Sequence, residues 1–191
     1  MISQRKKDLS LRFAKKIAKT LYVIVVLFAG CKTTSVANTN RITGDSLTDG
    51  QNVQKWILQV AEPGRASLAK DGERANVEIT VQGNRPWAII LNREKIQLEK
   101  GKTYRVDFQA SATRSIRLQV SAGMTKSPGY AYSGPHYFSV GATIVPCSYE
   151  FSMRQSSDAN AAISFSLGYL GTGNFAIENV KVVCLGDAPA D

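Results

Sequence analysis

Apolar and polar residues alternate with a period of two along most of the chain beyond residue 52. This period predicts β-strands that bury one face, and no long segment with the 3.6-residue period of a helix competes with it. The apolar positions of the predicted strands are Trp56, Leu58 and Val60; Val77, Ile79 and Val81; Tyr104, Val106, Phe108 and Ala110; Ile116, Leu118 and Val120; Tyr149, Phe151 and Met153; Ile163, Phe165 and Leu167; and Phe175 and Ile177.

Turn-forming residues separate these segments at short intervals, as in Gly83-Asn84, Ser127-Pro128-Gly129 and Gly134-Pro135. Short strands with frequent turns favour an all-β sandwich or barrel. The alternation also predicts a polar face on two strands, one with Arg105, Asp107 and Gln109 and one with Arg117 and Gln119. Such a face can offer hydrogen bonds to a hydroxylated ligand.

The pattern differs before residue 31, where seven Lys and Arg residues and one acidic residue precede the uncharged segment 21–30. That segment is too short for a spanning helix of about 20 residues but fits the apolar core of a secretory signal. A buried core helix is the alternative. The net charge of +9 falls to +3 once residues 1–30 are set aside, since 17 basic residues then face 14 acidic ones. We therefore expect no nucleic-acid partner.

The residues at the end of this segment, Leu27-Phe28-Ala29-Gly30-Cys31, resemble the lipobox of bacterial lipoproteins, although Phe28 replaces the usual aliphatic residue. The resemblance implies a signal peptide over 1–30, lipidation of Cys31 and anchoring to a membrane of the bacterial cell envelope. Acyl chains contribute about 0.8 kcal/mol per buried methylene, so several chains hold a protein stably on a membrane. Residues 31–51, rich in Thr, Ser, Asn and Gly, are expected to form a tether.

Besides Cys31, the chain has two further cysteines, Cys147 and Cys184. An even number in an oxidising compartment permits a disulfide between them. Each also adjoins an apolar strand-like run, so both can equally be small buried hydrophobic residues.

Four segments carry a second resemblance: Trp56-Ile-Leu, Pro86-Trp87-Ala-Ile-Ile-Leu91, Leu98-Glu-Lys-Gly-Lys-Thr-Tyr-Arg-Val-Asp-Phe-Gln-Ala110 and Phe175-Ala-Ile-Glu-Asn-Val-Lys-Val182. In this order and spacing they resemble the jelly-roll carbohydrate-binding modules of families four and nine, found beside cellulases and xylanases. The resemblance implies a β-sandwich of two antiparallel sheets over 52–185, followed by a tail over 186–191. It also implies a non-catalytic domain that binds a polysaccharide or oligosaccharide in a cleft, and we expect a monomer.

In such modules, sugars stack on aromatic rings while polar neighbours bind the hydroxyl groups. Trp87 is the first candidate from its place in the motif. It also alternates with Ile89 and Leu91 as a core face would, and if it is buried, Asn92 becomes the better candidate. Arg117 and Gln119, on the polar face of their strand, are further candidates, with solvated surface residues as the alternative.

The loop 129–138 is rich in aromatic residues, and Tyr130 and Tyr132 are candidates for a stacking wall at the cleft edge. The alternative is a loop that folds its tyrosines onto the sandwich. An aromatic-walled groove with a polar floor here would favour a glycan, whereas an exposed apolar patch would favour a protein partner.

The resemblance also implies a structural calcium ion, with Asp45 and Glu178 at the matching positions, where Glu178 replaces the usual aspartate. Carboxylate oxygens suit calcium. Among enzyme alternatives, the best is a jelly-roll polysaccharide lyase using His136, Tyr137 and Arg117. His136 is the only histidine, and neither a zinc cluster nor a nucleophile motif is present in the sequence, so we expect a binding protein without catalysis.

Overall fold

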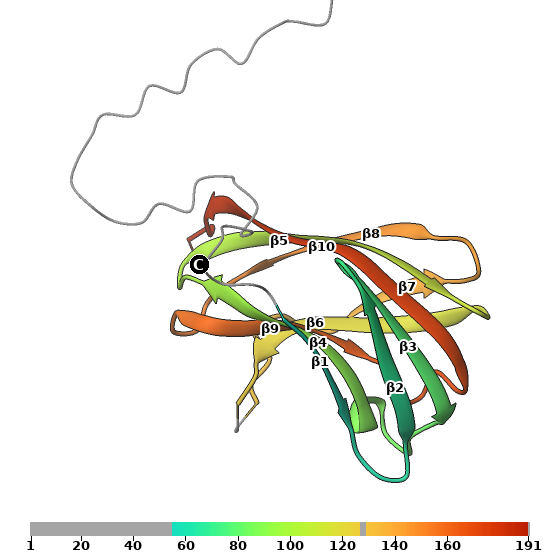
Figure 1. The fold of residues 1–191 in the computed structure, drawn as a ribbon. Coiled ribbons are helices and arrows are strands. Elements are labelled where there is room, and N and C mark those ends of the chain that lie inside the picture. The colour runs from blue at the N-terminus through green and yellow to red at the C-terminus, as the bar shows by residue number, and fades with distance from the viewer. Residues whose placement is uncertain (1–54, 127–128, 191) are drawn as a thin grey trace, which may run out of the picture. The chain divides into compact units, whose positions relative to one another are not determined.

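Ten strands and one short 3-10 helix make up residues 55–126 and 129–190, the part of the chain that the computed structural model describes (Figure 1). In chain order they are β1 (Lys55–Val60), β2 (Arg65–Asp71), β3 (Arg74–Val81), the helix η1 (Pro86–Ala88), β4 (Ile89–Leu98), β5 (Lys102–Ala112), β6 (Ile116–Met124), β7 (His136–Val140), β8 (Val145–Ser152), β9 (Asp158–Ser166) and β10 (Gly173–Asp187).

The strands form two five-stranded antiparallel sheets that face each other (Figure 1). The first sheet has the order β1-β4-β9-β6-β7 and the second has the order β2-β3-β10-β5-β8. Most neighbours in each sheet are not consecutive in sequence, as in β4 beside β9 and β3 beside β10, whereas β2–β3 and β6–β7 are consecutive pairs. The all-β jelly-roll prediction is confirmed.

The core lies between the sheets and is filled by the apolar members of the alternating segments. Phe108, from the second sheet, makes edge-to-face contacts with Phe138 and Phe165 of the first sheet, each with ring centroids 5.2 Å apart. Such aromatic pairs contribute roughly 0.5–1.5 kcal/mol beyond the area they bury. These contacts fix one sheet against the other, so the outer faces of both sheets are held by a rigid interior.

One charged side chain, Arg93, is buried on the inner face of β4. Its guanidinium carbon lies 5.0 Å from the ring centroid of Trp56, and its terminal nitrogen pairs with the carboxylate of Glu73. The indole nitrogen of Trp56 in turn donates a hydrogen bond to the carbonyl of Glu73 at 3.3 Å. Because a buried charge is tolerated only when it is paired, this group ties β1 and β4 to the turn before β3.

The strands differ from the sequence predictions at two places. β2 was not predicted, because its apolar positions Ala66 and Leu68 are few and only half buried. β10 extends to Asp187, into the range expected as a tail, and Lys102 forms an ion pair with Asp187 at 2.6 Å.

The two cysteines are free and are not bonded to each other. Cys147 lies opposite Phe108 on one side of β5, and Cys184 lies opposite Tyr104 on the other side. They are therefore about 10 Å apart across the strands and about 13 Å apart along them, whereas a disulfide needs Cα atoms within about 7 Å. The structure corrects the disulfide prediction. Cys147 is a small buried residue, and burial raises the pKa of its thiol.

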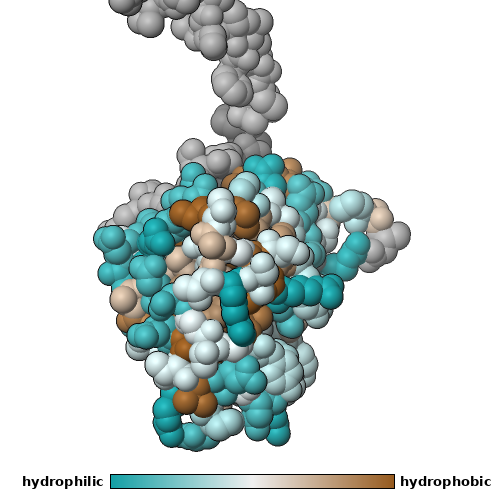
Figure 2. All heavy atoms as spheres, turned by 90° about the vertical axis from the view of Figure 1, so that its right-hand side faces the viewer, coloured by the Kyte–Doolittle hydropathy of each residue, from teal (hydrophilic) through white to brown (hydrophobic). Residues whose placement is uncertain are grey.

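The surface is mixed in character. On the face drawn in Figure 2, hydrophobic residues form small separate groups among hydrophilic ones. Scattered apolar residues of this kind are ordinary on a soluble surface. None of the helical segments in the described ranges is both long and apolar enough to cross a bilayer.

Candidate functional site

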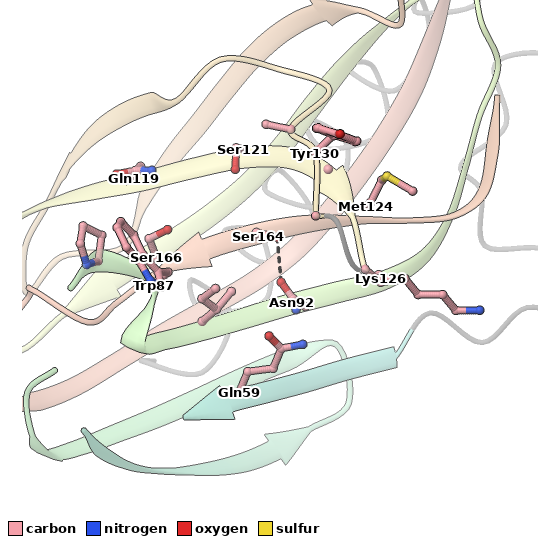
Figure 3. A pocket seen from close by; sticks show the side chains of 16 residues that line it. Gln59, Trp87, Asn92, Gln119, Ser121, Met124, Lys126, Tyr130, Ser164 and Ser166 are labelled. Atoms are coloured by element: carbon pink, nitrogen blue, oxygen red, sulfur yellow. Dashed lines mark hydrogen bonds between the residues drawn. The ribbon is translucent and has the colours of Figure 1, made fainter. Parts of the chain in front are cut away.

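A cleft of about 540 Å³ opens on the outer face of the first sheet (Figure 3). Its floor comes from β1, β4, β9 and β6, and its walls come from η1 and from the loop between β6 and β7. The residues that line it are Gln59, Pro86, Trp87, Ile90, Asn92, Gln119, Ser121, Gly123, Met124, Thr125, Lys126, Gly129, Tyr130, Ala131, Ser164 and Ser166.

Trp87 forms one wall and is 60% exposed. It belongs to η1, which begins with Pro86, so it precedes β4 and does not share the alternation of that strand. Ile89 and Leu91 are buried, as expected for the core face. The period of two does not apply to Trp87, because a helical turn and not a strand carries it, and of the two placements that the sequence left open the exposed one is observed.

Two close approaches of the backbone position this turn. A Cβ added to Gly168 would lie 2.1 Å from the carbonyl oxygen of Arg85 and 2.8 Å from that of Pro86. The Gly168 nitrogen donates to the Pro86 carbonyl at 3.0 Å, and the Gly83 nitrogen donates to the Gly168 carbonyl at 2.9 Å. Only glycine leaves room at position 168, so the loop after β9 holds the segment that presents Trp87.

Tyr130 forms the opposite wall and is 64% exposed (Figure 3). Its carbonyl accepts a hydrogen bond of 2.9 Å from the Met124 nitrogen, and the neighbouring Ala131 bridges to Gly123. The loop therefore pairs with the last two residues of β6, and this pairing sets the tyrosine at the rim of the cleft.

Tyr132 does not reach the cleft and is 8% exposed. Ala131 shares the cleft face with Gly123, so the following side chain points to the opposite side. There the Tyr132 hydroxyl donates a hydrogen bond of 2.8 Å to Asp158. Burial and this bond raise the pKa of Tyr132 to about 12. The predicted role of Tyr132 in stacking is corrected to a structural one.

The floor of the cleft is polar. Asn92 is 4% exposed and lines the cleft, and Ser164 donates a hydrogen bond of 2.8 Å to its side-chain oxygen. Gln119 also lines the cleft, as predicted. The side chains of Gln59, Gln119, Ser121 and Ser166 make no hydrogen bond with another described residue, so their donors and acceptors are available to a ligand.

Arg117 lies on the same face as Gln119 but outside the cleft lining. Its guanidinium carbon is 4.3 Å from the ring centroid of Tyr137. His136 points the other way and stacks on Tyr149 at 4.0 Å, because successive residues of β7 face opposite sides. The three residues considered for a lyase therefore do not converge on one site.

Four floor residues, Gln59, Ser121, Ser164 and Ser166, were not predicted. Ser164 and Ser166 alternate with the buried Ile163 and Phe165, so the period did place them on an outer face. The missing information was strand order. Asn92 pairs with Ser164, and Gln119 pairs with Ser166, only because β9 lies between β4 and β6.

Charge is sparse in the cleft. Among the described lining residues, Lys126 carries the only full charge at neutral pH, and no aspartate or glutamate is present. Aromatic rings, amides and hydroxyls therefore supply the chemistry of the site, which is suited to stacking and hydrogen bonding.

Residues 45–172 match the family model for the carbohydrate binding domain of families four and nine. The chain belongs to this family. The matched range includes all of the residues that line the cleft, so the cleft is a feature of the carbohydrate-binding domain itself.

Solved structures share the fold of this carbohydrate-binding domain. A family-four carbohydrate-binding module has 22% identity and a TM-score of 0.61, with 73% of this chain and 94% of that chain covered. The second N-terminal cellulose-binding domain of Cellulomonas fimi β-1,4-glucanase C has 20% identity, a TM-score of 0.53 and coverage of 73% and 90%. The xylan-binding domain CBM22-1 of Paenibacillus barcinonensis Xyn10C has 7% identity, a TM-score of 0.51 and coverage of 76% and 97%. No curated protein matches the chain.

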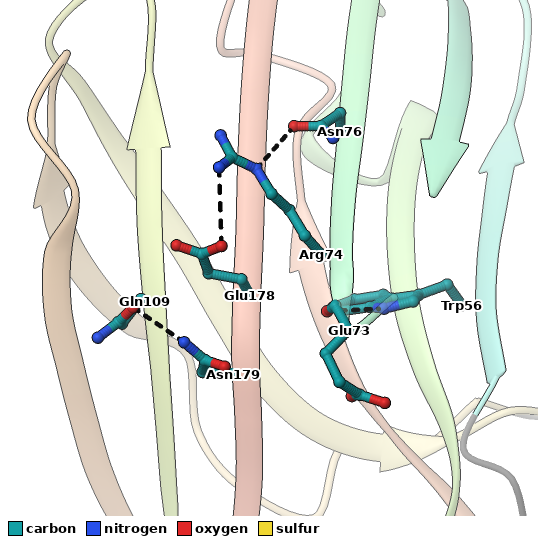
Figure 4. A network of polar contacts seen from close by, with 7 residues as sticks. All are labelled: Trp56, Glu73, Arg74, Asn76, Gln109, Glu178 and Asn179. Carbon is teal, nitrogen blue, oxygen red and sulfur yellow. Dashed lines mark hydrogen bonds and ion pairs between the residues drawn. The ribbon is translucent and has the colours of Figure 1, made fainter. Parts of the chain in front are cut away.

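The calcium prediction rests on two acids, of which Asp45 lies outside the described residues. The other, Glu178, forms an ion pair of 3.7 Å with Arg74, which also donates to Asn76 (Figure 4). The Glu178 carboxylate is therefore already paired with a cation. Within 55–126 and 129–190, no group of three or more His, Cys, Asp or Glu residues is arranged to hold a metal. The calcium ion stays a prediction.

Proposed function

We propose that the carbohydrate-binding domain binds a polysaccharide chain in the cleft between Trp87 and Tyr130, without a chemical step. The observation that carries this proposal is the pair of exposed aromatic rings on opposite sides of a polar floor. Large exposed rings are costly to leave in water, so their gathering around one cleft indicates a ligand.

The chemistry of a sugar fits this arrangement. A pyranose ring has an apolar face, which stacks on an aromatic ring, and a rim of hydroxyls, which both donate and accept hydrogen bonds. Gln59 and Gln119 each offer a carbonyl oxygen and an NH₂ group. Binding must desolvate these polar groups and order the ligand, so the expected affinity is modest.

Binding is favoured over hydrolysis for a separate reason. Glycosidases use two carboxyl groups on either side of the scissile bond. The described lining supplies none, and Lys126 has no carboxylate partner in it. We therefore propose a domain that holds a glycan and leaves it intact.

Titration calorimetry of the purified full chain tests the proposal. The probes are soluble β-glucans, xylan, mannan and a uronate polymer. We expect heat of binding with at least one polymer, at least tenfold weaker binding after Trp87→Ala or Tyr130→Ala, and no change in polymer length. Ile144→Ala, which removes an exposed apolar side chain outside the cleft, is the control. No binding by folded protein to any polymer, or cleavage of one, would contradict the proposal.

We also propose that the domain is monomeric and is held on a bacterial membrane by acyl chains on Cys31. The support is the basic stretch, the short apolar segment and the small residues before the cysteine. Metabolic labelling with a palmitate analogue is the test. Label on the wild-type chain and none on Cys31→Ser is expected, and equal labelling of both would contradict the anchor.

A further inference from the structure

The register of the first sheet places five side chains in one row across all five strands. Gln59 of β1 lies opposite Ile90 of β4, Ile90 lies opposite Ser166 of β9, Ser166 lies opposite Gln119 of β6, and Gln119 lies opposite Tyr137 of β7. Residues directly opposite each other in antiparallel strands share a face, so all five side chains are on the outer side of the sheet.

The two aromatic walls lie on opposite sides of this row. Trp87 is three residues before Ile90, beyond one end of β4, and Tyr130 contacts the other end of β6 through Met124. Figure 3 shows Trp87 and Tyr130 on the two sides, with Gln59 and Gln119 on either side of the β4 and β9 strands. A chain that passes between the walls therefore crosses the strands along the row.

The cleft covers the row only from Gln59 to Gln119. The row continues for one more strand and ends at Tyr137, which is 48% exposed on the edge strand. Adjacent strands are about 4.8 Å apart, so the full row spans about 19 Å. This spacing is close to the length of one sugar unit in an extended polymer, and each strand can meet about one unit.

Arg117 lies beside Tyr137 at the end of the row. It lies opposite Ser139, diagonal to Tyr137 on the same face, and its guanidinium carbon is 4.3 Å from the tyrosine ring centroid. Stacking of this kind fixes the orientation of a ring that would otherwise rotate freely on an edge strand. The guanidinium covers one face of the ring, and because Tyr137 is still 48% exposed, the rest of the ring is open to a ligand beside the N–H donors of Arg117.

From this row we infer that Tyr137 and Arg117 form an additional sugar subsite outside the cleft, which binds the end of a longer chain. The inference rests on the proposed function. Tyr137 stacks on the apolar face of the sugar and Arg117 donates hydrogen bonds to its hydroxyls. The domain therefore prefers long polymers to short oligosaccharides, because only a chain that extends past Gln119 reaches this subsite.

Affinity as a function of chain length tests the subsite. We would titrate the full chain with oligosaccharides of three to six units, prepared from whichever panel polymer the wild-type protein binds. Tyr137→Ala is expected to weaken binding of the six-unit ligand roughly three- to tenfold and to leave the three-unit ligand within about twofold. Tyr137→Phe keeps the ring and should retain the affinity for both. Arg117→Ala should lower affinity for the six-unit ligand alone, by a smaller factor.

The outcomes separate this inference from the proposed function. Equal effects of Tyr137→Ala on both lengths, or no effect on either, would overturn the subsite while the cleft still binds. A loss only for the long ligand supports it. If the wild-type protein binds no probe, the proposed function fails and the subsite fails with it. Circular dichroism and thermal unfolding of each variant establish that a loss of binding is not a loss of fold.

Discussion

The outer faces of the two sheets are both rich in polar residues, but those residues are used differently. On the first sheet, Gln59, Gln119, Ser121 and Ser166 make no side-chain hydrogen bond within the described chain. On the second sheet, the polar side chains bond to one another: Arg105 to Asp107, Ser148 to Asp107, Asn179 to Gln109, and Arg74 to Asn76 and Glu178 (Figure 4).

The volume of the depression on each sheet does not distinguish the two outer faces. The second face has a depression of about 520 Å³, nearly the size of the cleft, lined by residues that include Asp107, Gln109 and Asn179. Of its polar side chains, Asp107, Gln109, Ser148 and Asn179 are hydrogen-bonded to neighbouring side chains, and none of its described lining residues is an exposed aromatic ring. The comparison teaches that unoccupied polar groups beside exposed rings, rather than concavity, distinguish a binding face from a solvated one.

The largest expected effect comes from Gly168→Ala. The new Cβ would collide with the backbone of Arg85 and Pro86, so the segment that presents Trp87 must move. We expect a loss of about 1–3 kcal/mol in the free energy of unfolding, together with loss of polysaccharide binding. Urea unfolding and calorimetry measure the two effects.

Gly134→Ala is the matched control for Gly168→Ala. A Cβ at Gly134 would meet nothing within 4 Å. Its stability and binding should equal those of the wild type. If Gly168→Ala behaved like Gly134→Ala, the close approach would not be what positions Trp87.

The next largest expected effect is that of Trp87→Ala, which should lower affinity for the polysaccharide without lowering the stability of the fold. Because this side chain is mostly exposed, Trp87→Ala should lower affinity roughly tenfold to a hundredfold and change the free energy of unfolding by less than about 0.5 kcal/mol. Parallel calorimetry and chemical unfolding would show the split. A large loss of stability would mean that the residue supports the fold.

Tyr132 links the cleft loop to the interior, and its removal should have a smaller effect. Tyr132→Phe loses the hydrogen bond to Asp158 and should cost about 1–2 kcal/mol. The folded protein keeps this phenol neutral to about pH 12, whereas the unfolded chain ionises near pH 10, so its contribution is present below pH 10 and is lost as the pH rises toward 12. Unfolding at pH 8 and pH 11 should therefore show a shallower alkaline loss in Tyr132→Phe. Identical losses in both proteins would contradict this role.

The smallest effect is the most direct comparison of the two faces. Gln119 on the cleft face is unbonded, and Gln109 on the other face accepts a hydrogen bond from Asn179 at 3.0 Å. Gln119→Ala should weaken binding about three- to fivefold with unchanged stability. Gln109→Ala should leave binding unchanged and cost under about 1 kcal/mol of stability. Equal effects on binding would remove the distinction between the faces.

Much of the fold could be predicted from the alternation, because a period of two assigns each strand residue to a face. The outward placement of Arg117 and Gln119 follows from it. The exceptions are places where the extent of strand geometry was not visible in the sequence. Trp87 lies on a helical turn and not on a strand, whereas Ala131 pairs with Gly123 in a segment expected to be a loop, so strand alternation turns Tyr132 inward.

The site was harder to predict, because it depends on which strands are neighbours. Ser164 and Asn92 are 72 residues apart in sequence and are joined by a hydrogen bond on the cleft floor. Nothing in either local segment specifies that pairing. The glycine at position 168 is similar, since its necessity comes from the backbone of Arg85, which is remote in sequence and close in space.

The fluorescence of the two tryptophans tests the central claim most directly. Trp56 is buried beside Phe165 and Arg93, and Trp87 is exposed at the cleft. Addition of a polysaccharide that binds should shift the emission to shorter wavelength and protect it from acrylamide, and Trp87→Phe should abolish both changes. Binding that leaves the emission of Trp87 unchanged would contradict the assignment of the cleft as the glycan site.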